Sequence, residues 1–263
     1  MKKGIDISKY QTVDWEKVSG IDFVIIRAGY GLETIDPKFK SHTEGALSHG
    51  LEIGFYWFLY CTDITGARKN ADMFAKTIAP YKDKINKKVW CDFEYDTERY
   101  ANQKGVYFTK ESRTEIVKAF CERMYELGYD VGVYANPDYL THKLGTVSKY
   151  PLWLAWYNGD KGNYNCYMWQ YTSRGQVDGI KGEVDCNYCY EVEEEKEDIP
   201  NLKGCMGNSI VTLLQENGYQ SSFAYRKKLW KMLGQVESYK GTAEQNAKLI
   251  ILLGGNVKDN LPS

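Results

Sequence analysis

The chain has 263 residues, of which 43% are apolar and 26% charged, and its formal net charge at pH 7 is −1. This composition is typical of a globular protein with one large domain, or with one large and one small domain. A nearly neutral chain is not an obvious partner for nucleic acid. No stretch approaches the roughly 18 consecutive apolar residues of a membrane-spanning helix. We therefore expect neither nucleic-acid binding nor membrane insertion.

The N-terminus and the cysteines bear on where the protein is made. Lys2 and Lys3 lead directly into a strand-like segment without an apolar h-region, which predicts that a secretory signal is absent. The seven cysteines are an odd number without a tight framework, so we expect free thiols. Cys186 and Cys189 form a lone C-x-x-C, which is weak support for a zinc site. We expect no metal and no cofactor.

The first 190 residues alternate between strand-like and helix-like patterns. Continuous apolar runs of this kind, separated by helices, are typical of a parallel sheet that is covered by helices. Their number predicts an α/β fold, a β/α barrel, in which chemistry is found at the carboxyl ends of the strands. The strand-like segments are 3–7, 21–28, 51–60, 87–95, 129–134, 151–156 and 167–171, and the helix-like segments are 38–49, 65–79 and 109–128.

The strand at 87–95 carries two carboxylates. Side chains alternate across a strand, so Asp92 and Glu94 are expected on one face, with Val89, Cys91 and Phe93 on the other. Paired carboxyl groups near aromatic rings are the usual equipment for cleaving a glycosidic bond. A solvated acidic edge would show the same letters, so this motif alone does not decide between the two.

The C-terminal part of the chain differs in charge and pattern. The acidic run at 191–199, followed by Pro200, predicts a linker over 191–200 between domains at 1–190 and 201–263. Helix-like segments at 209–217, 221–233 and 242–253 predict that the second domain is small and mostly helical. Its basic stripe is either an ordinary solvated helix face or a surface that attracts anionic polymers. The stripe consists of Arg226, Lys227, Lys228 and Lys231.

Eight segments in order resemble one family, glycoside hydrolase family 25, the Chalaropsis-type lysozymes. Each motif is weak by itself, but their common order over about residues 3–190 makes coincidence improbable. The segments are GIDISKYQ at 4–11 with VDW at 13–15, FVIIRAGYG at 23–31, GFYWF at 54–58, DFE at 92–94, GVY at 132–134, LWLA at 152–155, WQY at 169–171 and VDCN at 184–187.

The resemblance implies an irregular β/α (TIM-like) barrel that hydrolyses the β-1,4 bond between N-acetylmuramic acid and N-acetylglucosamine in bacterial peptidoglycan. It also implies four acidic residues in the groove, which match Asp6, Asp92, Glu94 and Asp185. The chain departs from the pattern at Trp57, where many members have His, and we expect this change to alter the shape of the groove.

Each acidic residue is given an expected role. Glu94 has the longer arm and is expected to be the general acid, kept protonated by its neighbour Asp92 and by aromatic walls. Asp92 is expected to orient the N-acetyl group of the substrate; a nucleophilic role, or an inverting scheme, stays open. Asp6 and Asp185 would share charge with Asp92, although Asp6 could simply cap a turn and Asp185 could pair with Lys181.

Side chains at strand ends are expected to bind substrate, although some could instead fill the barrel. They are Tyr56, Phe58, Tyr134, Trp153 and Gln170. The three histidines show no ligand spacing and are expected at the surface; they are His42, His49 and His142.

The tail is similar to C-terminal wall-binding modules of endolysins from phages of clostridia and related bacteria. The similarity rests on segments 221–223, 226–229 and 239–246. It implies a phage endolysin that accumulates in the host bacterial cytoplasm without a signal peptide and acts on the wall after release. Cleavage of the linker, or an internal start at Met206, could release a module that self-associates with the full chain. The alternatives are a hydrolase of another N-acetylated glycan, such as chitin, and a wall-binding protein without catalysis.

Overall fold

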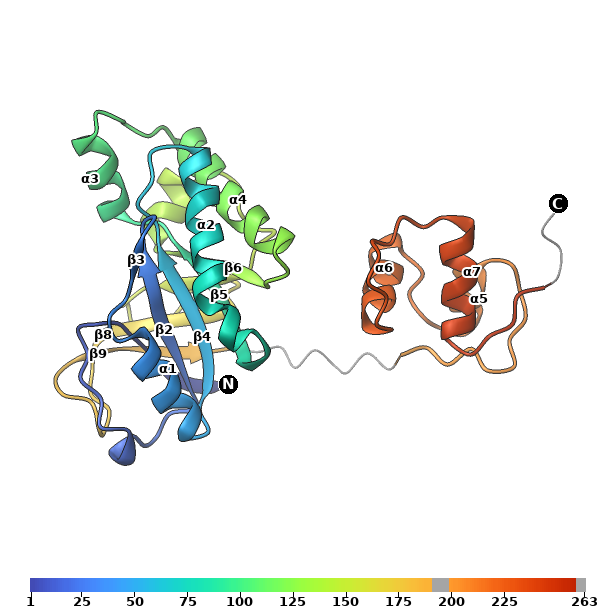
Figure 1. The fold of residues 1–263 in the computed structure, drawn as a ribbon, viewed down its shortest axis with the longest axis horizontal. Helices are drawn as coiled ribbons and strands as arrows, with labels where there is room; N and C mark the ends of the chain where they lie inside the picture. Colours follow the sequence, from blue (N-terminus) through green and yellow to red (C-terminus); the bar gives the residue numbers. More distant parts are fainter. Residues whose placement is uncertain (191–198, 259–263) are drawn as a thin grey trace. The chain divides into compact units, whose positions relative to one another are not determined.

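The computed structural model describes residues 1–190 and 199–258, which fall into two compact units, Met1–Val192 and Glu193–Ser263 (Figure 1). The acidic linker expected at 191–200 lies outside the described residues, except for its last two positions. None of the helices in the described ranges has the length and apolar character needed to cross a membrane.

The first unit is a closed barrel with helices outside it. Its sheet has the order β1-β9-β8-β7-β6-β5-β4-β2-β3, and pairing of β1 with β2 closes the ring, which confirms the α/β barrel (Figure 1). The strands are β1 (Lys2–Ile7), β2 (Phe23–Tyr30), β3 (Thr34–Ile35), β4 (Glu52–Phe58), β5 (Ile85–Asp92), β6 (Val131–Ala135), β7 (Leu152–Ala155), β8 (Met168–Gly175) and β9 (Val184–Cys189).

One strand of the barrel departs from the expected parallel sheet. The pairings from β1 through β2, β4, β5, β6 and β7 to β8 are parallel, whereas β9 runs antiparallel to both β8 and β1. A short loop can join antiparallel neighbours, so β8 leads to β9 without a crossover helix. The last strand therefore enters the ring from the opposite end.

Helices cover the outside of the barrel over β2, β4, β5 and β6 and bury the outer face of these strands. Outward side chains such as Val89 and Cys91 pack with Phe74 and Phe120 of the helices in a continuous apolar core. Thr109 accepts a hydrogen bond from the Ser112 N–H and so caps the longest of these helices. The helical elements are η1 (Trp15–Lys17), α1 (Phe39–Ser48), α2 (Ile64–Ile78), η2 (Ala79–Lys84), α3 (Tyr95–Gln103), α4 (Lys110–Glu126) and the π-helical η3 (Tyr139–Lys143).

The inside of the barrel holds a separate apolar cluster. Phe23, Trp90, Trp153 and Met168 are buried there and fill the interior beneath the strand ends. Trp90 belongs to this inner cluster while its neighbours in the sequence face the helices, as the alternation along a strand requires. The inner face of β5 therefore leads from Trp90 to Asp92 at the end of the strand.

The expected strand at 87–95 is too long at its C-terminal end. Strand β5 ends at Asp92, and Glu94 is the N-cap residue of α3, a helix that the sequence analysis does not predict. Asp96 and Glu98 lie in the first turn of α3, where negative charge favours the N-terminus of a helix. Glu94 thus reaches the end of the barrel from a helix cap and not from the strand itself.

The second unit has its own apolar core. Its helices, α5 (Ile210–Glu216), α6 (Phe223–Met232) and α7 (Ala243–Leu252), match the expected segments. Ser209, Ser222 and Thr242 cap them by accepting backbone N–H groups of the first turn. The core consists of Leu202, Ile210, Leu213, Leu214, Tyr225, Leu229, Trp230, Tyr239, Leu249, Ile250 and Leu253.

Candidate active site

A pocket of about 350 Å³ opens at the carboxyl ends of the parallel barrel strands. It brings together all of the side chains that the sequence nominates, while their individual roles stay predictions. These are Asp6, Tyr56, Phe58, Asp92, Glu94, Tyr134, Trp153, Gln170 and Asp185.

Asp6 and Asp185 lie opposite each other on the antiparallel pair β1 and β9. Two amides hold Asp6, since Asn187 Nδ2 and Gln170 Nε2 both donate to its Oδ2, each at 2.8 Å. Burial, then the neighbouring Asp185 carboxylate, raise the pKa of Asp6 well above its ordinary range against the effect of these amides. Burial raises the pKa of Asp185 to about 6, while a hydrogen bond with Asp6 opposes the rise.

This arrangement argues against two simpler interpretations, in which Asp6 caps a turn and Asp185 pairs with Lys181. Asp6 is bonded to side chains from β8 and β9 and is not a turn cap. No ion pair among the described residues joins Asp185 to Lys181.

Asp92 is a buried carboxylate with one unused acceptor. Its Oδ1 atom is inaccessible to solvent and has no hydrogen-bond partner. Burial, and then the carboxylates of Glu94 and Asp6, raise the pKa of Asp92 well above its ordinary range, and Arg27 acts in the opposite direction. A buried acceptor without a donor is costly, and such exceptions are found at functional sites.

Glu94 has a pKa that suits a general acid near neutral pH. Burial, and then the Asp185 carboxylate, raise its pKa to about 7, while the Tyr134 hydroxyl opposes the rise. An acid with a pKa near the working pH is protonated in a large fraction of the molecules and still releases its proton readily. The backbone N–H of Glu94 donates to Thr97 Oγ1 at 3.2 Å, so the cap of α3 holds the residue in place.

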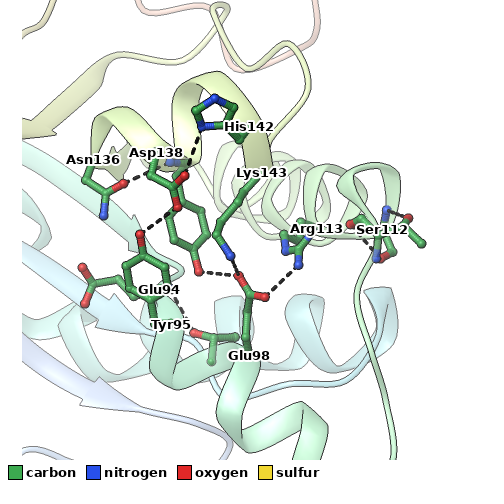
Figure 2. A network of polar contacts seen from close by, with 12 residues as sticks. Glu94, Tyr95, Glu98, Ser112, Arg113, Asn136, Asp138, His142 and Lys143 are labelled. Atoms are coloured by element: carbon green, nitrogen blue, oxygen red, sulfur yellow. Dashed lines mark hydrogen bonds and ion pairs between the residues drawn. The ribbon is translucent and has the colours of Figure 1, made fainter.

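Polar contacts tie the first turn of α3 to neighbouring elements (Figure 2). Glu98 accepts a hydrogen bond of 2.7 Å from Arg113 Nη2 on α4. The Tyr95 hydroxyl donates to Asp138 Oδ2, just before η3, at 2.8 Å. Because Glu94 directly precedes this anchored turn, its carboxyl group has a restricted position.

One wall of the pocket is a chain of hydrogen bonds that ends on a carboxylate. The hydroxyls of Tyr134 and Tyr157 donate to Gln170 Oε1 at 3.0 and 2.6 Å, and the Gln170 amide in turn donates to Asp6. These contacts fix the positions of two phenol rings that line the pocket. The exposed ring of Tyr157 belongs to the lining and is available to a sugar face.

Trp153 has a supporting place in this wall. Its side chain is only 2% exposed, and Nε1 donates to Asn187 Oδ1 at 2.8 Å. The same Asn187 donates to Asp6, so the indole orients the amide that holds this carboxylate. Trp153 also packs edge-on against Tyr134 and Tyr56, which are half-buried at the pocket floor.

Two expectations about individual residues are wrong. Trp57 does not line the groove, because it alternates with Tyr56 and Phe58 and points outward, where its Nε1 donates to Gly31 O and Asn70 Oδ1. His42 is 4% exposed and not at the surface, since its Nε2 contacts Ser8 O at 3.2 Å under the barrel rim. His49 and His142 are exposed, as expected.

The pocket also contains residues that the sequence analysis does not nominate. Arg27 is the most informative, and its place on β2 two residues after the inward-facing Ile25 is a signal that could have identified it. The others include Ser8, Tyr10 and Gln11, all within the first motif of the resemblance.

Comparison with known proteins agrees with this geometry. The model of the family "Glycosyl hydrolases family 25" matches residues 5–180. The autolytic lysozyme of Clostridium acetobutylicum is 33% identical over 189 residues, which cover 70% of this chain and 54% of that protein. Lysozyme M1 of Streptomyces globisporus is 26% identical over 198 residues, which cover 70% and 66%. The chain thus spans about half the length of the autolytic lysozyme.

Solved structures show the same fold. The modular autolysin LytC of Streptococcus pneumoniae, in complex with a synthetic peptidoglycan ligand, has a TM-score of 0.62 and 26% identity, covering 71% of this chain and 46% of LytC. The CTP1L endolysin has a TM-score of 0.61 and 24% identity, covering 82% and 77%. With the family model matched over most of the barrel, the chain belongs to glycosyl hydrolases family 25.

Proposed function

We propose that the barrel hydrolyses the β-1,4 bond between N-acetylmuramic acid and N-acetylglucosamine in bacterial peptidoglycan. The observation that carries this proposal is one pocket that holds Glu94, whose pKa is about 7, beside the buried Asp92, whose Oδ1 has no hydrogen-bond partner. One group can supply a proton and the other can accept a hydrogen bond from the substrate, which are the two functions that glycoside cleavage requires.

In the first step, the protonated Glu94 gives its proton to the glycosidic oxygen as the bond to the anomeric carbon breaks. The carbonyl oxygen of the substrate's own N-acetyl group attacks that carbon and forms a cyclic oxazolinium ion. Asp92 accepts a hydrogen bond from the N–H of this N-acetyl group through its unused Oδ1 atom. This contact keeps the carbonyl oxygen directed at the anomeric carbon. Substrate assistance of this kind is a recognised variant of the two-carboxylate scheme.

In the second step, the Glu94 carboxylate takes a proton from water, and the hydroxyl group opens the ring at the anomeric carbon. The configuration at that carbon is therefore retained. Asp6 and Asp185 act on Asp92 and Glu94 through charge, since Asp6 raises the pKa of Asp92 and Asp185 raises that of Glu94. Tyr56, Phe58 and Tyr134 line the pocket where sugar rings would stack.

Two relatives support peptidoglycan over other N-acetylated glycans as the substrate. The relative at 33% identity is an autolytic lysozyme. The LytC autolysin, at 26% identity, has been solved with a synthetic peptidoglycan ligand. The family match over residues 5–180 includes Asp6, Asp92 and Glu94 of the pocket.

We further propose that the second unit binds the wall and that the chain is a phage endolysin, made in the host cytoplasm and active after release. The second unit has its own apolar core, which supports its interpretation as an independent binding module. Lys227 and Lys231 of α6 are exposed and suit an anionic wall polymer. Arg226 does not belong to this surface, because it is half-buried and its Nη1 donates to Tyr239 and Asn246.

An internal start at Met206 would produce a fragment that lacks part of the core of the second unit. A chain beginning at Met206 would lack Leu202, which is fully buried in the core and whose N–H donates to Leu253 O at 2.8 Å. We therefore propose that any self-association involves a module that keeps residues from 200 onward, as cleavage within the linker would leave it.

Mass spectrometry of peptidoglycan digests tests the proposed reaction. Purified peptidoglycan and, in parallel, chitin oligomers are digested with the wild type and with Glu94→Gln, and the new reducing ends are reduced and identified. Reducing N-acetylmuramic acid from the wild type alone is the expected result. Reducing N-acetylglucosamine would indicate a glucosaminidase, cleavage of chitin oligomers alone would indicate another glycan, and no product from either protein would leave a binding protein.

A further inference from the structure

Two cationic side chains lie together beside the pocket, on the side of β1 and β2. Arg27 is on β2 and lines the pocket, and Lys9 follows β1. The centre of the Tyr10 ring lies 5.2 Å from Lys9 Nζ and 5.5 Å from Arg27 Cζ. For the Tyr30 ring the corresponding distances are 5.8 and 5.5 Å. Such distances are typical of cation–π contacts, so the two cations and the two rings form one cationic cluster.

One carboxylate belongs to this cluster. Arg27 Nε donates to Asp36 Oδ2 at 2.8 Å, and the two side chains are 12% and 0% exposed. The backbone N–H of Lys9 donates to the same oxygen at 3.0 Å. Its ammonium, in contrast, forms no ion pair with a carboxylate of residues 1–190 and 199–258. The cationic cluster therefore has one positive charge more than its own carboxylate neutralises.

The rest of the pocket has the opposite charge. Asp6, Asp92, Glu94 and Asp185 line it, and Arg27 is the one cationic side chain of the lining within the described residues. A carboxylate on a ligand is repelled by these four groups wherever they are ionised, and it is attracted to the cationic cluster. The charges thus favour the side of β1 and β2 for an acidic substituent.

The cationic cluster is accessible to a ligand in the pocket. Tyr10 lines the pocket and is 74% exposed. Lys9 is half-buried and not in the lining itself, but its ammonium lies over the Tyr10 ring. Arg27 is fixed before any ligand binds, because the backbone N–H groups of Lys9 and Lys38 hold its partner Asp36 at 3.0 and 2.9 Å. A ligand therefore meets one fixed cation and one cation without a carboxylate partner.

We propose that Lys9, with Arg27 beside it, binds the carboxylate that distinguishes a muramic acid unit from N-acetylglucosamine, and so determines the specificity of the pocket. N-acetylmuramic acid carries a lactyl ether on C3, next to the N-acetyl group on C2. The carboxylate is that of the lactyl group or, where a peptide is attached to this group, an acidic residue of the peptide. This inference rests on the proposed function, because it names the part of the proposed substrate that the pocket recognises.

Strand register is consistent with this placement. Arg27 pairs with Tyr56 of β4, and Phe58 of β4 pairs with Asp92 of β5. The strands of Arg27 and Asp92 are thus two spacings apart, which is about 10 Å. A sugar ring bound between them would place its C2 substituent at Asp92 and its C3 substituent toward the cationic cluster.

Binding to a variant without the proposed general acid tests the proposal in the full chain. Glu94→Gln is the parent, and Lys9→Gln is added to it, which keeps the backbone N–H that holds Asp36. Lys40→Gln is the matched control, because it removes the same charge from a side chain that is 78% exposed and pairs with Glu44. Titration calorimetry measures the affinity for three soluble probes of equal length. These are peptide-free fragments that contain N-acetylmuramic acid, peptide-bearing fragments, and chitin oligomers.

Lys9→Gln is expected to weaken binding of the muramic acid fragments about fivefold, as for the loss of one partly exposed ion pair, and to leave the affinity for chitin oligomers unchanged. Lys9→Arg is expected to keep the parent affinities, and so is Lys40→Gln. A loss with peptide-free fragments identifies the lactyl carboxylate as the ligand, whereas a loss with peptide-bearing fragments alone identifies a peptide carboxylate. Equal affinity of Lys9→Gln and the parent for both kinds of fragment, or an equal loss for chitin oligomers, would overturn the proposal.

Hydrolysis of the same fragments is measured separately, with Glu94 intact. A wild type that releases no reducing ends, while Lys9→Gln still weakens binding selectively, would contradict the proposed function alone. Hydrolysis of the fragments with the same KM in the wild type and in Lys9→Gln would contradict the role of Lys9 alone.

Discussion

Asp6 and Asp185 are direct partners across the antiparallel strands β1 and β9, so two carboxyl groups face each other at the end of the barrel. Like charges at opposed positions of a sheet destabilise the pairing. The protein holds them together by burial and by amides from Gln170 and Asn187, and the pKa of each carboxyl is raised. Bringing these carboxyl groups together therefore lowers the stability of the fold, and the rest of the barrel offsets this loss.

The rate of hydrolysis is expected to fall as pH rises above about 7. The pKa of Glu94 is raised to about 7 by burial and by Asp185, and only the protonated form can donate to the leaving oxygen. We expect kcat/KM on soluble peptidoglycan fragments to decrease about tenfold per pH unit well above this pKa. Rates that stay constant from pH 6 to pH 9 would contradict Glu94 as the general acid, and Glu94→Gln provides the baseline.

Glu94→Gln is expected to stabilise the barrel, and more so at high pH. The folded pKa of Glu94 is about 7 against an ordinary value of 4.5, so the folded state binds the proton more tightly. The wild type therefore loses free energy of unfolding as pH rises from about 4.5 to about 7, and the variant does not. We expect the advantage of the variant to grow by roughly 2 kcal/mol between pH 5 and pH 8, measured by urea unfolding.

Glu98→Gln is the matched control for this measurement. Burial raises the pKa of Glu98, but hydrogen bonds from Arg113 and Tyr139 outweigh it, so the pKa is lowered. The stability from this group is present above its ordinary pKa and is lost as pH falls. Glu98→Gln is therefore expected to destabilise the protein at pH 8, the opposite sign to Glu94→Gln. The same sign for both variants would refute the linkage argument.

Trp57→Phe is expected to lower stability without changing the groove. The indole is fully buried against Phe74, and its loss removes the N–H that donates to Gly31 O and Asn70 Oδ1. A cost of about 1–3 kcal/mol is typical when a buried acceptor loses its donor. Thermal unfolding and KM on soluble fragments check this, with Tyr56→Phe as the neighbour that faces the pocket. A KM change limited to Trp57→Phe would place this residue in the groove after all.

Deleting residues 200–263 is expected to weaken adsorption to purified cell walls while cleavage of soluble fragments continues. The barrel and the tail have separate apolar cores, so neither needs the other to bury its side chains. Co-sedimentation with walls and reducing-end release are measured on the same preparations. Full adsorption by the truncated chain would assign wall binding to the barrel.

Local patterns predicted much of the architecture. Apolar runs separated by helices predicted the barrel, and Thr109, Ser222 and Thr242 are N-caps where the helices were expected to begin. The boundary at Asp92 and the helix α3 were missed, because Tyr95, Asp96 and Thr97 carry no strong periodic signal of their own. Contacts of Glu98 and Tyr95 with α4 and η3 stabilise that helix, and these are tertiary.

The sequence by itself determined which carboxylates to expect in one site, because strand alternation predicted Asp92 at a strand end and the order of the motifs in the family resemblance implied Asp6, Glu94 and Asp185 beside it. Only the tertiary structure decided how they meet. The direction of β9 put Asp185 against Asp6, the cap of α3 supplied Glu94, and Asp36 held Arg27 in the lining of the pocket. Strand direction, helix anchoring and buried ion pairs depend on residues far apart in the chain, and so no local pattern encodes them.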